Sequence, residues 1–175
     1  VFLGVVHRLD RPVSGCVVYA RTSKALTRLS ELFRTRDVKK SYWAIVTDRP
    51  PAEEGSLHNY LKKNEQQNKS YVYDKEVKGS KSADLSYKIL ARSERYYLLE
   101  IDLQTGRHHQ IRAQLAAAGC PVRGDLKYGA KRSNEGGGIS LHSRRVSFIH
   151  PVKNEEINVV APLPDDRIWK LFKNV

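Results

Sequence analysis

The chain contains 175 residues, of which 31 are lysine or arginine and 19 are aspartate or glutamate, so its net charge at pH 7 is +12. Hydrophobic residues account for 40% and charged residues for 29%, proportions that exclude a disordered or fibrous chain and are typical of a soluble globular protein. No apolar run reaches the roughly 20 residues that a membrane span requires. The positive charge favours a polyanionic partner, with nucleic acid first and an anionic membrane surface second.

The two cysteines, Cys16 and Cys120, are far apart and have no paired Cys/His spacing around them. This pattern excludes a disulfide scaffold and a zinc ribbon, and it is typical of the reducing cytoplasm. The chain lacks methionine and starts at Val1 in a strand-like segment, so we expect that the first strands of its domain are not included. No linker or internal repeat divides residues 1–175, which we interpret as a single catalytic domain.

Strands and one helix are predicted in the first fifty residues. The β-branched segments 1–7 and 15–20 flank the turn-forming sequence DRPVSG, which indicates a strand, a loop and a strand. Ser23 is a candidate N-cap for a helix that ends near Arg36, because its apolar residues recur with the spacing of one buried face. Segment 39–47 is strand-like again.

The rest of the chain is predicted to be mostly strand. A meander of four strands and then two late strands are expected at 56–62, 70–77, 83–91, 96–103, 139–149 and 156–161. Thr105 is a candidate cap for a second helix, which stops at Gly119 and Pro121, and a short amphipathic helix is expected at 165–173. Many strands with few, irregularly placed helices predict an α+β fold with a mixed, mostly antiparallel sheet flanked by a few helices and loops.

The first candidate site is the sequence HRLDRP at 7–12. Asp10 lies between Arg8 and Arg11, at the end of a strand and before a rigid turn. Flanking positive charge lowers the pKa of an aspartate and keeps it ionised, as a nucleophile or an electrostatic stabiliser must be. The alternative is that Asp10 starts the turn and forms a structural ion pair.

The second candidate site is TGRHHQIR at 105–112. In a helix, His108 and Arg112 would share one face, and the free N–H groups of the helix start beside Arg107 would suit a phosphate. His108 and His109 would point about 100° apart, which makes a poor joint metal site. The alternative is a basic, solvated helix face.

The third candidate site mixes cations with aromatic rings. Lys39 and Lys40 precede Tyr42 and Trp43, a combination that suits stacking against unpaired bases beside a phosphate backbone. Strand alternation turns one of the two rings inward, and that ring is expected to pack in the core.

Four motif stretches cover most of the chain: HRLDRPVSGCVVYAR (7–21), KKSYWAIV (39–46), LQTGRHHQIRAQLAAAGCPVRGDLKYG (103–129) and ISLHSRRVSFIHP (139–151). In order and spacing they resemble the RluA-type pseudouridine synthases, which isomerise uridine in RNA, and the pair HRLD with GRxHQIR is a specific signature. The resemblance implies a pseudouridine synthase-like fold and an Asp-dependent cleavage of the glycosidic bond. The base is then rejoined through uracil carbon 5, after the nucleotide has been flipped from its stack.

The resemblance also assigns roles to individual residues. The aspartate of HRLD is catalytic, which maps to Asp10, and the last arginine of HQIR pairs with it, which maps to Arg112. The tyrosine of the K-x-Y-x-A strand lies against the target base and maps to Tyr42. The arginine before Leu-Asp helps to replace the extruded base and maps to Arg8, while Leu141 matches an apolar residue that lines the uracil pocket.

Other features complete the expected RNA site. Further RNA contacts are expected from the basic side chains of Arg107, His108, Lys39 and Lys40. Val13 stands where many members of the family have threonine and Gln114 where histidine is frequent, which puts only local substrate contacts in doubt.

We expect a cytoplasmic monomer without an obligate protein partner that acts on ribosomal RNA or tRNA. It would need no cofactor or metal, because the reaction involves no redox change, phosphoryl transfer or metal-activated water.

Two other functions are open at this stage. One is an RNA-binding domain that has kept the scaffold without the chemistry. The other is an RNA hydrolase or nuclease that uses histidine and aspartate. It would need a metal cluster or a histidine acid–base pair, and only scattered histidines are available at His7, His58, His142 and His150.

Overall fold

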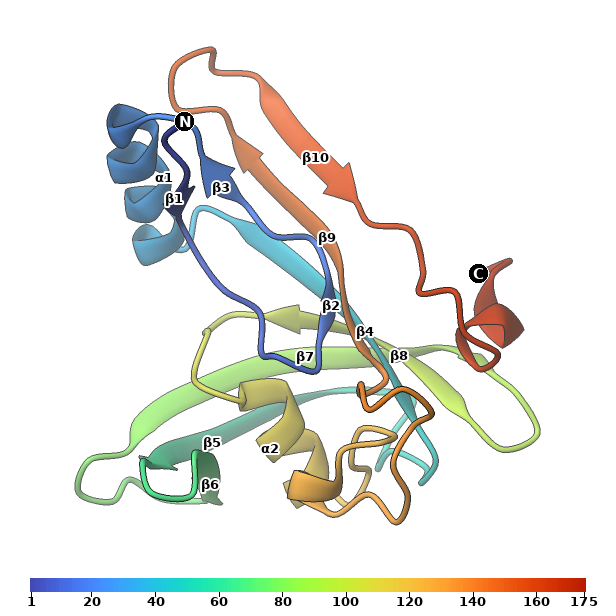
Figure 1. Cartoon of the computed structure of the whole chain (residues 1–175). Helices are drawn as coiled ribbons and strands as arrows, with labels where there is room; N and C mark the ends of the chain where they lie inside the picture. Colours follow the sequence, from blue (N-terminus) through green and yellow to red (C-terminus); the bar gives the residue numbers. More distant parts are fainter.

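An eight-stranded, mostly antiparallel sheet organises the computed structural model, which describes residues 1–175 (Figure 1). The strand order is β10-β9-β4-β8-β7-β5-β6, and β2 pairs with β9 in parallel. The strands of this sheet are β2 (Ser14–Gly15), β4 (Lys39–Val46), β5 (Glu54–Asn64), β6 (Lys69–Tyr73), β7 (Lys81–Arg92), β8 (Tyr97–Leu103), β9 (Leu141–Ile149) and β10 (Glu156–Val160). The α+β fold predicted from the sequence is therefore confirmed.

The four central strands are present, but they do not form a simple meander. β7 returns along β5, so β6 is left at the edge of the sheet. The lengths of the strands account for this order, because β5 has 11 residues and β7 has 12, whereas β6 has only five. Pairing the two long strands satisfies more backbone hydrogen bonds than pairing β7 with β6 would.

The N-terminal segment contributes shorter strands than predicted. β1 (Gly4–Val5) and β3 (Tyr19–Ala20) form a separate two-stranded ladder, and only β2 joins the large sheet. Helix α1 (Ser23–Thr35) follows, and its N-cap is Thr22 rather than Ser23. Thr22 has the extended backbone that an N-cap requires, and its hydroxyl accepts a hydrogen bond from the Ala25 N–H at 3.1 Å.

Helix α2 (Gln110–Ala117) starts later than predicted, and Thr105 is not its cap. His109 has a left-handed backbone with φ of 54°, which interrupts any helical path from residue 106. Instead, the Thr105 hydroxyl donates to Gln110 Oε1 at 2.8 Å, and Oε1 also accepts from the Arg107 N–H at 2.9 Å. The helix ends at Ala117 with Ala118 as its C-cap, before Gly119 in a left-handed conformation, as predicted.

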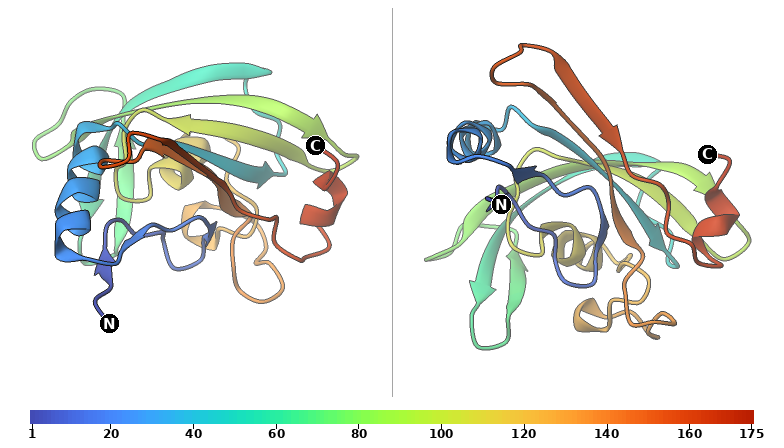
Figure 2. Two further views of the ribbon diagram at one scale, coloured as in Figure 1. Left: turned by 90° about the horizontal axis from the view of Figure 1, so that it is seen from above. Right: turned by 45° about the horizontal axis from the view of Figure 1, so that its top comes forward.

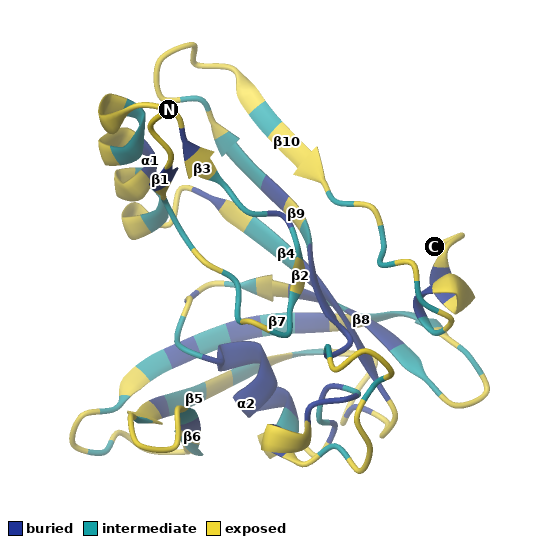
Figure 3. Cartoon of the chain, viewed as in Figure 1, coloured by how far each residue is buried: buried dark blue, intermediate teal, exposed yellow.

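The sheet is covered on both faces, so Tyr42 and Trp43 are both buried, which corrects the prediction of a single inward ring. Tyr42 packs in the largest core cluster with Ile111 of α2. Trp43 points to the other face and packs against Phe172 in a short 3-10 turn, η2 (Trp169–Phe172), where an amphipathic helix was expected. Figure 2 shows α2 and the N-terminal segment on one side of the sheet, and Figure 3 shows how completely α2 is buried.

None of the helices has the length and apolar composition that crossing a lipid bilayer would require.

Candidate active site

A cleft of about 1250 Å³ opens between the loop after β1, the start of β4 and the loop before α2. Its wall includes the nine residues to which the sequence analysis assigned catalytic or RNA-binding roles, namely Asp10, Tyr42, Arg112, Arg8, Arg107, His108, Leu141, Lys39 and Lys40. The cleft is strongly basic. Nine of the side chains along it are cationic, whereas the acids are Asp10 and Asp102. A concave basic surface of this kind attracts and focuses a polyanion.

Asp10 lies in the turn that follows β1, with its side chain 30% exposed at the cleft. Its carbonyl oxygen accepts from the Val13 N–H at 2.9 Å, so Asp10 also starts the turn, as the structural alternative held. The chain then runs beside β9, where Gly15 pairs with Ser143. This parallel pairing fixes where the carboxylate of Asp10 is presented.

Arg112 connects this exposed carboxylate to a buried one. Its Nη1 donates to Asp10 Oδ2 at 3.2 Å, while Nε and Nη2 donate to Asp125 Oδ2 and Oδ1 at 2.6 and 2.9 Å. The side chains of Arg112 and Asp125 are 5% and 1% exposed. Burial by itself would lower the pKa of Arg112, but the hydrogen bonds and charges of Asp125 and then Asp10 outweigh it and raise that pKa. The guanidinium is therefore a fixed cation behind Asp10.

His109 and Tyr128 form a second support for Asp10. The Tyr128 hydroxyl accepts from the Ser70 N–H at 2.8 Å and lies 2.9 Å from His109 Nδ1. The other ring nitrogen of His109, Nε2, lies 3.7 Å from Asp10 Oδ2. Burial is the largest cause that lowers the pKa of His109, to about 4, so the ring is neutral at pH 7.

Tyr42 and Leu141 form the apolar wall of the cleft. They lie on the same face of the β4–β9 ladder, because Leu141 pairs with Ala44, two residues from Tyr42 along β4. Both side chains are buried in the main core cluster and still border the cleft. Burial is the largest cause that raises the pKa of Tyr42, so its phenol is protonated at neutral pH. A flat apolar wall beside a carboxylate suits a heterocyclic base.

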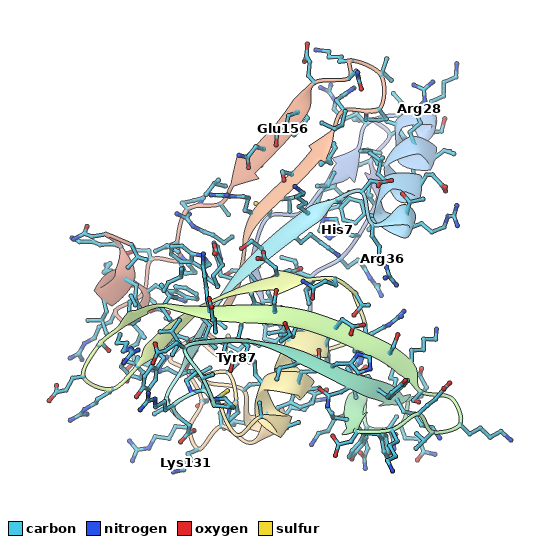
Figure 4. All side chains as sticks on the ribbon, turned by 180° about the vertical axis from the view of Figure 1, so that it is seen from behind. His7, Arg28, Arg36, Tyr87, Lys131 and Glu156 are labelled. Atoms are coloured by element: carbon cyan, nitrogen blue, oxygen red, sulfur yellow. The ribbon has the colours of Figure 1, made fainter.

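The cationic side chains at the rim of the cleft differ in solvent exposure and in their hydrogen-bond partners. Arg8 and Lys39 are exposed, while Lys40 is half-buried with Nζ 5.8 Å from the ring centre of Phe33. Arg107 lies in the loop before α2, where Nε donates to the Ser82 carbonyl at 2.7 Å. Figure 4 shows His7 against α1 and Arg36 at the end of that helix, which borders the same cleft. The positive charge thus surrounds the entrance.

The predicted relationship between His108 and Arg112 on one helix face is wrong, because His108 precedes the helix. Its ring stacks on that of His109 with the centres 3.7 Å apart, instead of diverging by a helical step. His108 Nδ1 lies 2.9 Å from Ser70 Oγ, which ties the loop to β6. No group of three or more histidine, cysteine, aspartate or glutamate side chains is arranged to hold a metal ion.

Comparison with known proteins identifies the family of the chain. The family model described as RNA pseudouridylate synthase matches residues 2–117. The chain belongs to this family. A solved structure, human RNA pseudouridylate synthase domain containing 4, superposes with a TM-score of 0.82 at 25% identity and covers 98% of this chain and 75% of that one. A second solved structure, human RNA pseudouridylate synthase domain containing 1, shares the fold, with a TM-score of 0.77 at 23% identity over 94% of this chain and 69% of that one.

Bacterial pseudouridine synthases are similar in sequence as well. An uncharacterized RNA pseudouridine synthase of Zymomonas mobilis is 36% identical over 91% of this chain and 73% of its own length. The tRNA pseudouridine synthase C of Vibrio parahaemolyticus is 32% identical over 95% of this chain and 74% of its own. Several other relatives are longer. The chain spans about half the length of these, as with the Synechocystis protein, which is 32% identical over 92% of this chain and 50% of its own length.

Sequence reasoning about this pseudouridylate synthase family member missed the residues behind the cleft. Asp125, Tyr128 and His109 support Asp10 and Arg112, yet no role was assigned to them. The sequence did carry one signal, because Asp125 and Tyr128 belong to the GDLKYG end of the third motif stretch. From the sequence, an acidic residue in such a short turn is expected to be exposed to solvent. Asp125 is instead only 1% exposed, and a buried carboxylate requires a cationic partner.

Proposed function

We propose that residues 1–175 form a single catalytic domain of an RNA pseudouridine synthase, which isomerises specific uridines in structured ribosomal RNA or tRNA. The observation that carries the proposal is the Asp10 carboxylate, held by Arg112 at 3.2 Å beside the Tyr42 wall of a basic cleft. Family membership supports the reaction class. The Vibrio relative is named a tRNA pseudouridine synthase, which supports tRNA as a candidate substrate.

The proposed reaction conserves every atom of the nucleotide. The bond from the ribose anomeric carbon to ring nitrogen 1 breaks, the uracil turns, and carbon 5 bonds to the same sugar carbon. Carbon 5 loses a proton and nitrogen 1 gains one. Asp10 would add to the sugar or the ring, or remove a proton from the sugar, and each route requires an ionised carboxylate. Arg112 would keep Asp10 charged and aimed, and Tyr42 would stack on the uracil.

The target atoms are hidden in a stacked RNA helix, so the nucleotide must be flipped into the cleft. Flipping costs a few kcal/mol and costs least in loops and mismatches. Arg8 is exposed at the cleft and would fill the vacated place in the stack, while Arg107, His108, Lys39 and Lys40 would hold the RNA. The proposed enzyme is a cytoplasmic monomer that uses neither cofactor nor metal.

Tritium release from RNA labelled at uracil carbon 5 tests this function. With total RNA from cells that lack the protein, the wild type should release tritium, and Asp10→Asn should release none while it still binds RNA. Asp102→Asn is the matched control, because Asp102 borders the same cleft without a contact to Arg112, and it should retain activity.

Other outcomes would favour the alternative functions. Binding of RNA without tritium release by the wild type would indicate an RNA-binding domain. Strand scission that depends on an added divalent metal would indicate a nuclease. Full activity of Asp10→Asn would also overturn the proposal.

A further inference from the structure

The β5–β6 hairpin presents a face that the proposed reaction does not use. Directly opposite residues of antiparallel strands lie on one face. This places three cross-strand pairs together, namely Tyr60 with Tyr73, Lys62 with Tyr71, and Asn64 with Lys69. The intervening residues Leu61 and Val72 point the other way and pack with Ala113 and Ala116 of α2. The aromatic and basic face, which we call the outer face, is therefore turned away from the core.

A groove of about 420 Å³ lies on this outer face. Tyr71 and Tyr73 are its two hydrophobic side chains, and they are 39% and 38% exposed. Since they are two residues apart on one strand, their rings project from points about 6.7 Å apart. Two such rings offer two platforms for bases, and stacking of this kind tolerates any sequence because every base has a flat face.

The charge around the groove suits RNA. Residues 60–81 contain six lysines and three acidic residues. Lys62 lines the groove, and Lys69 Nζ lies 5.5 Å from the ring centre of Tyr71. Lys63 contributes less, because it pairs with Glu65 at 2.6 Å. Exposed tyrosines alone are common on edge strands, but tyrosines in a basic groove have the composition of a single-strand binding surface.

The groove lies next to the active-site cleft, and hydrogen bonds hold the hairpin turn in place. Lys63 borders both hollows. The hairpin turn is bonded both to the loop before α2 and to Lys127. His108 Nε2 lies 3.1 Å from Asn68 Oδ1, and Lys127 Nζ donates to the carbonyls of Gln67 and Asn68, both at 3.1 Å. A site that is already ordered loses little entropy when it binds.

We infer that this groove is a second RNA site, in which Tyr71 and Tyr73 stack unpaired bases that flank the target uridine. The inference rests on the proposed function for the nature of the RNA, because the flanking strand reaches the groove past Lys63 when a uridine occupies the cleft. Through this site the enzyme would prefer uridines that have an unpaired neighbour over those inside a continuous duplex.

Photocrosslinking tests the site directly. The probe is a single-stranded oligouridylate that carries 5-iodouridine, which crosslinks to an aromatic ring stacked on it when irradiated. Mass spectrometry of the intact protein's digest should identify crosslinks at Tyr71 or Tyr73. Crosslinks confined to the cleft around Tyr42, or equally frequent at the exposed Tyr19 of β3, would overturn the inference.

Substitutions supply an independent readout with the same probe. Tyr71→Ala and Tyr73→Ala should each weaken binding about tenfold, which corresponds to about 1.4 kcal/mol. Tyr71→Phe and Tyr73→Phe keep the ring and should bind like the wild type. Tyr19→Ala is the matched control, since Tyr19 is 49% exposed on another ladder. Equal affinity of the alanine variants and the wild type would overturn the inference.

Turnover separates the two proposals. In the tritium-release assay the alanine variants should raise KM and leave kcat unchanged, because neither tyrosine contacts Asp10 or Arg112. If the wild type isomerises uridine and the variants keep its KM, the proposed RNA site in the groove is wrong and the synthase function is supported. If the wild type releases no tritium while the variants still lose affinity for RNA, the synthase function is wrong and the RNA site in the groove is supported.

Discussion

The guanidinium of Arg112 joins two carboxylates of opposite exposure, with Asp125 bonded through Nε and Nη2 inside the protein and Asp10 bonded through Nη1 at the cleft. The bidentate bond fixes the plane of the guanidinium. Since this bond also sets the direction of Nη1, the position of Asp10 depends on Asp125, which does not line the cleft. Asp125 is therefore a positioning residue for Asp10.

Replacing the buried carboxylate should slow the reaction without weakening the binding of RNA. In Asp125→Asn the amide cannot accept both guanidinium bonds, so Arg112 shifts and Asp10 loses its aim. A misplacement of about 1 Å costs on the order of 10²-fold in rate, and we expect this loss in kcat with KM nearly unchanged. Steady-state tritium release measures both constants. A proportional rise in KM would instead assign Asp125 to binding.

Replacing the guanidinium of Arg112 by an ammonium should lower the turnover number more than the affinity for RNA. The ammonium of Arg112→Lys carries all its donors on one nitrogen, so it cannot reproduce the planar bidentate bond to Asp125 together with the separate bond to Asp10. We expect kcat to fall by about 10²-fold and RNA affinity to change little, as measured by tritium release and by anisotropy of labelled RNA. Equal losses in both quantities would show that Arg112 is a phosphate contact.

RNA binding should weaken with salt, and the rim cations should account for part of the slope. Removing one phosphate contact in Lys39→Ala should lower the slope of log K against log salt by about one unit. Lys131→Ala is the control, because Lys131 is exposed far from the cleft entrance at His7 and Arg36 (Figure 4). An unchanged slope for Lys39→Ala would remove Lys39 from the RNA site.

Acid should destabilise the protein through His109. The pKa of His109 is lowered from its ordinary 6.5 to about 4, with burial as the largest cause. Above pH 6.5 the ring is neutral in the folded and unfolded states and contributes no pH dependence. As the pH falls from 6.5 to about 4 the unfolded state alone gains a proton, so the free energy of unfolding falls.

Urea unfolding between pH 7 and pH 4 measures this loss. His109→Asn retains an amide that Tyr128 can bond and tolerates the left-handed backbone. It should flatten the pH dependence in this window. His7, whose pKa is also lowered to about 4 by burial first, should contribute a second, separate part. An identical pH dependence in wild type and His109→Asn would contradict the assignment.

Gly15 should be essential where β2 meets β9. Its φ is 117°, and an added Cβ would lie 2.3 Å from the Ser143 carbonyl oxygen. Gly15→Ala must therefore push the two backbones apart, and we expect a loss in the free energy of unfolding well above about 1 kcal/mol. Gly129→Ala is the control, with φ of 98° and open space around it. Chemical denaturation measures the free energy of unfolding of both variants. Gly129→Ala reports the backbone strain alone, so an equal loss in both variants would show that the clash with Ser143 contributes nothing.

Much of the fold and the cleft could be predicted from the sequence. The strands at β4, β7 and β8 follow from local alternation and β-branched composition, which act over a few residues. The choice of Asp10 and Arg112 followed from motifs that resemble a family, although 102 residues separate the two positions. Their meeting at 3.2 Å agrees with that pairing, while their roles in the reaction stay predictions.

The features that could not be predicted from the sequence depend on contacts between distant segments. The late start of α2 follows from the left-handed backbone of His109, and His109 is held there by Tyr128. The burial of both Tyr42 and Trp43 follows from a second layer that local alternation cannot reveal. Asp125 gains its importance from burial against Arg112. The charge, the strands and the candidate residues could be predicted without the fold, because these are properties of local chemistry. The support behind Asp10 was decided by packing, because desolvation and hydrogen-bond geometry exist only once the chain is folded.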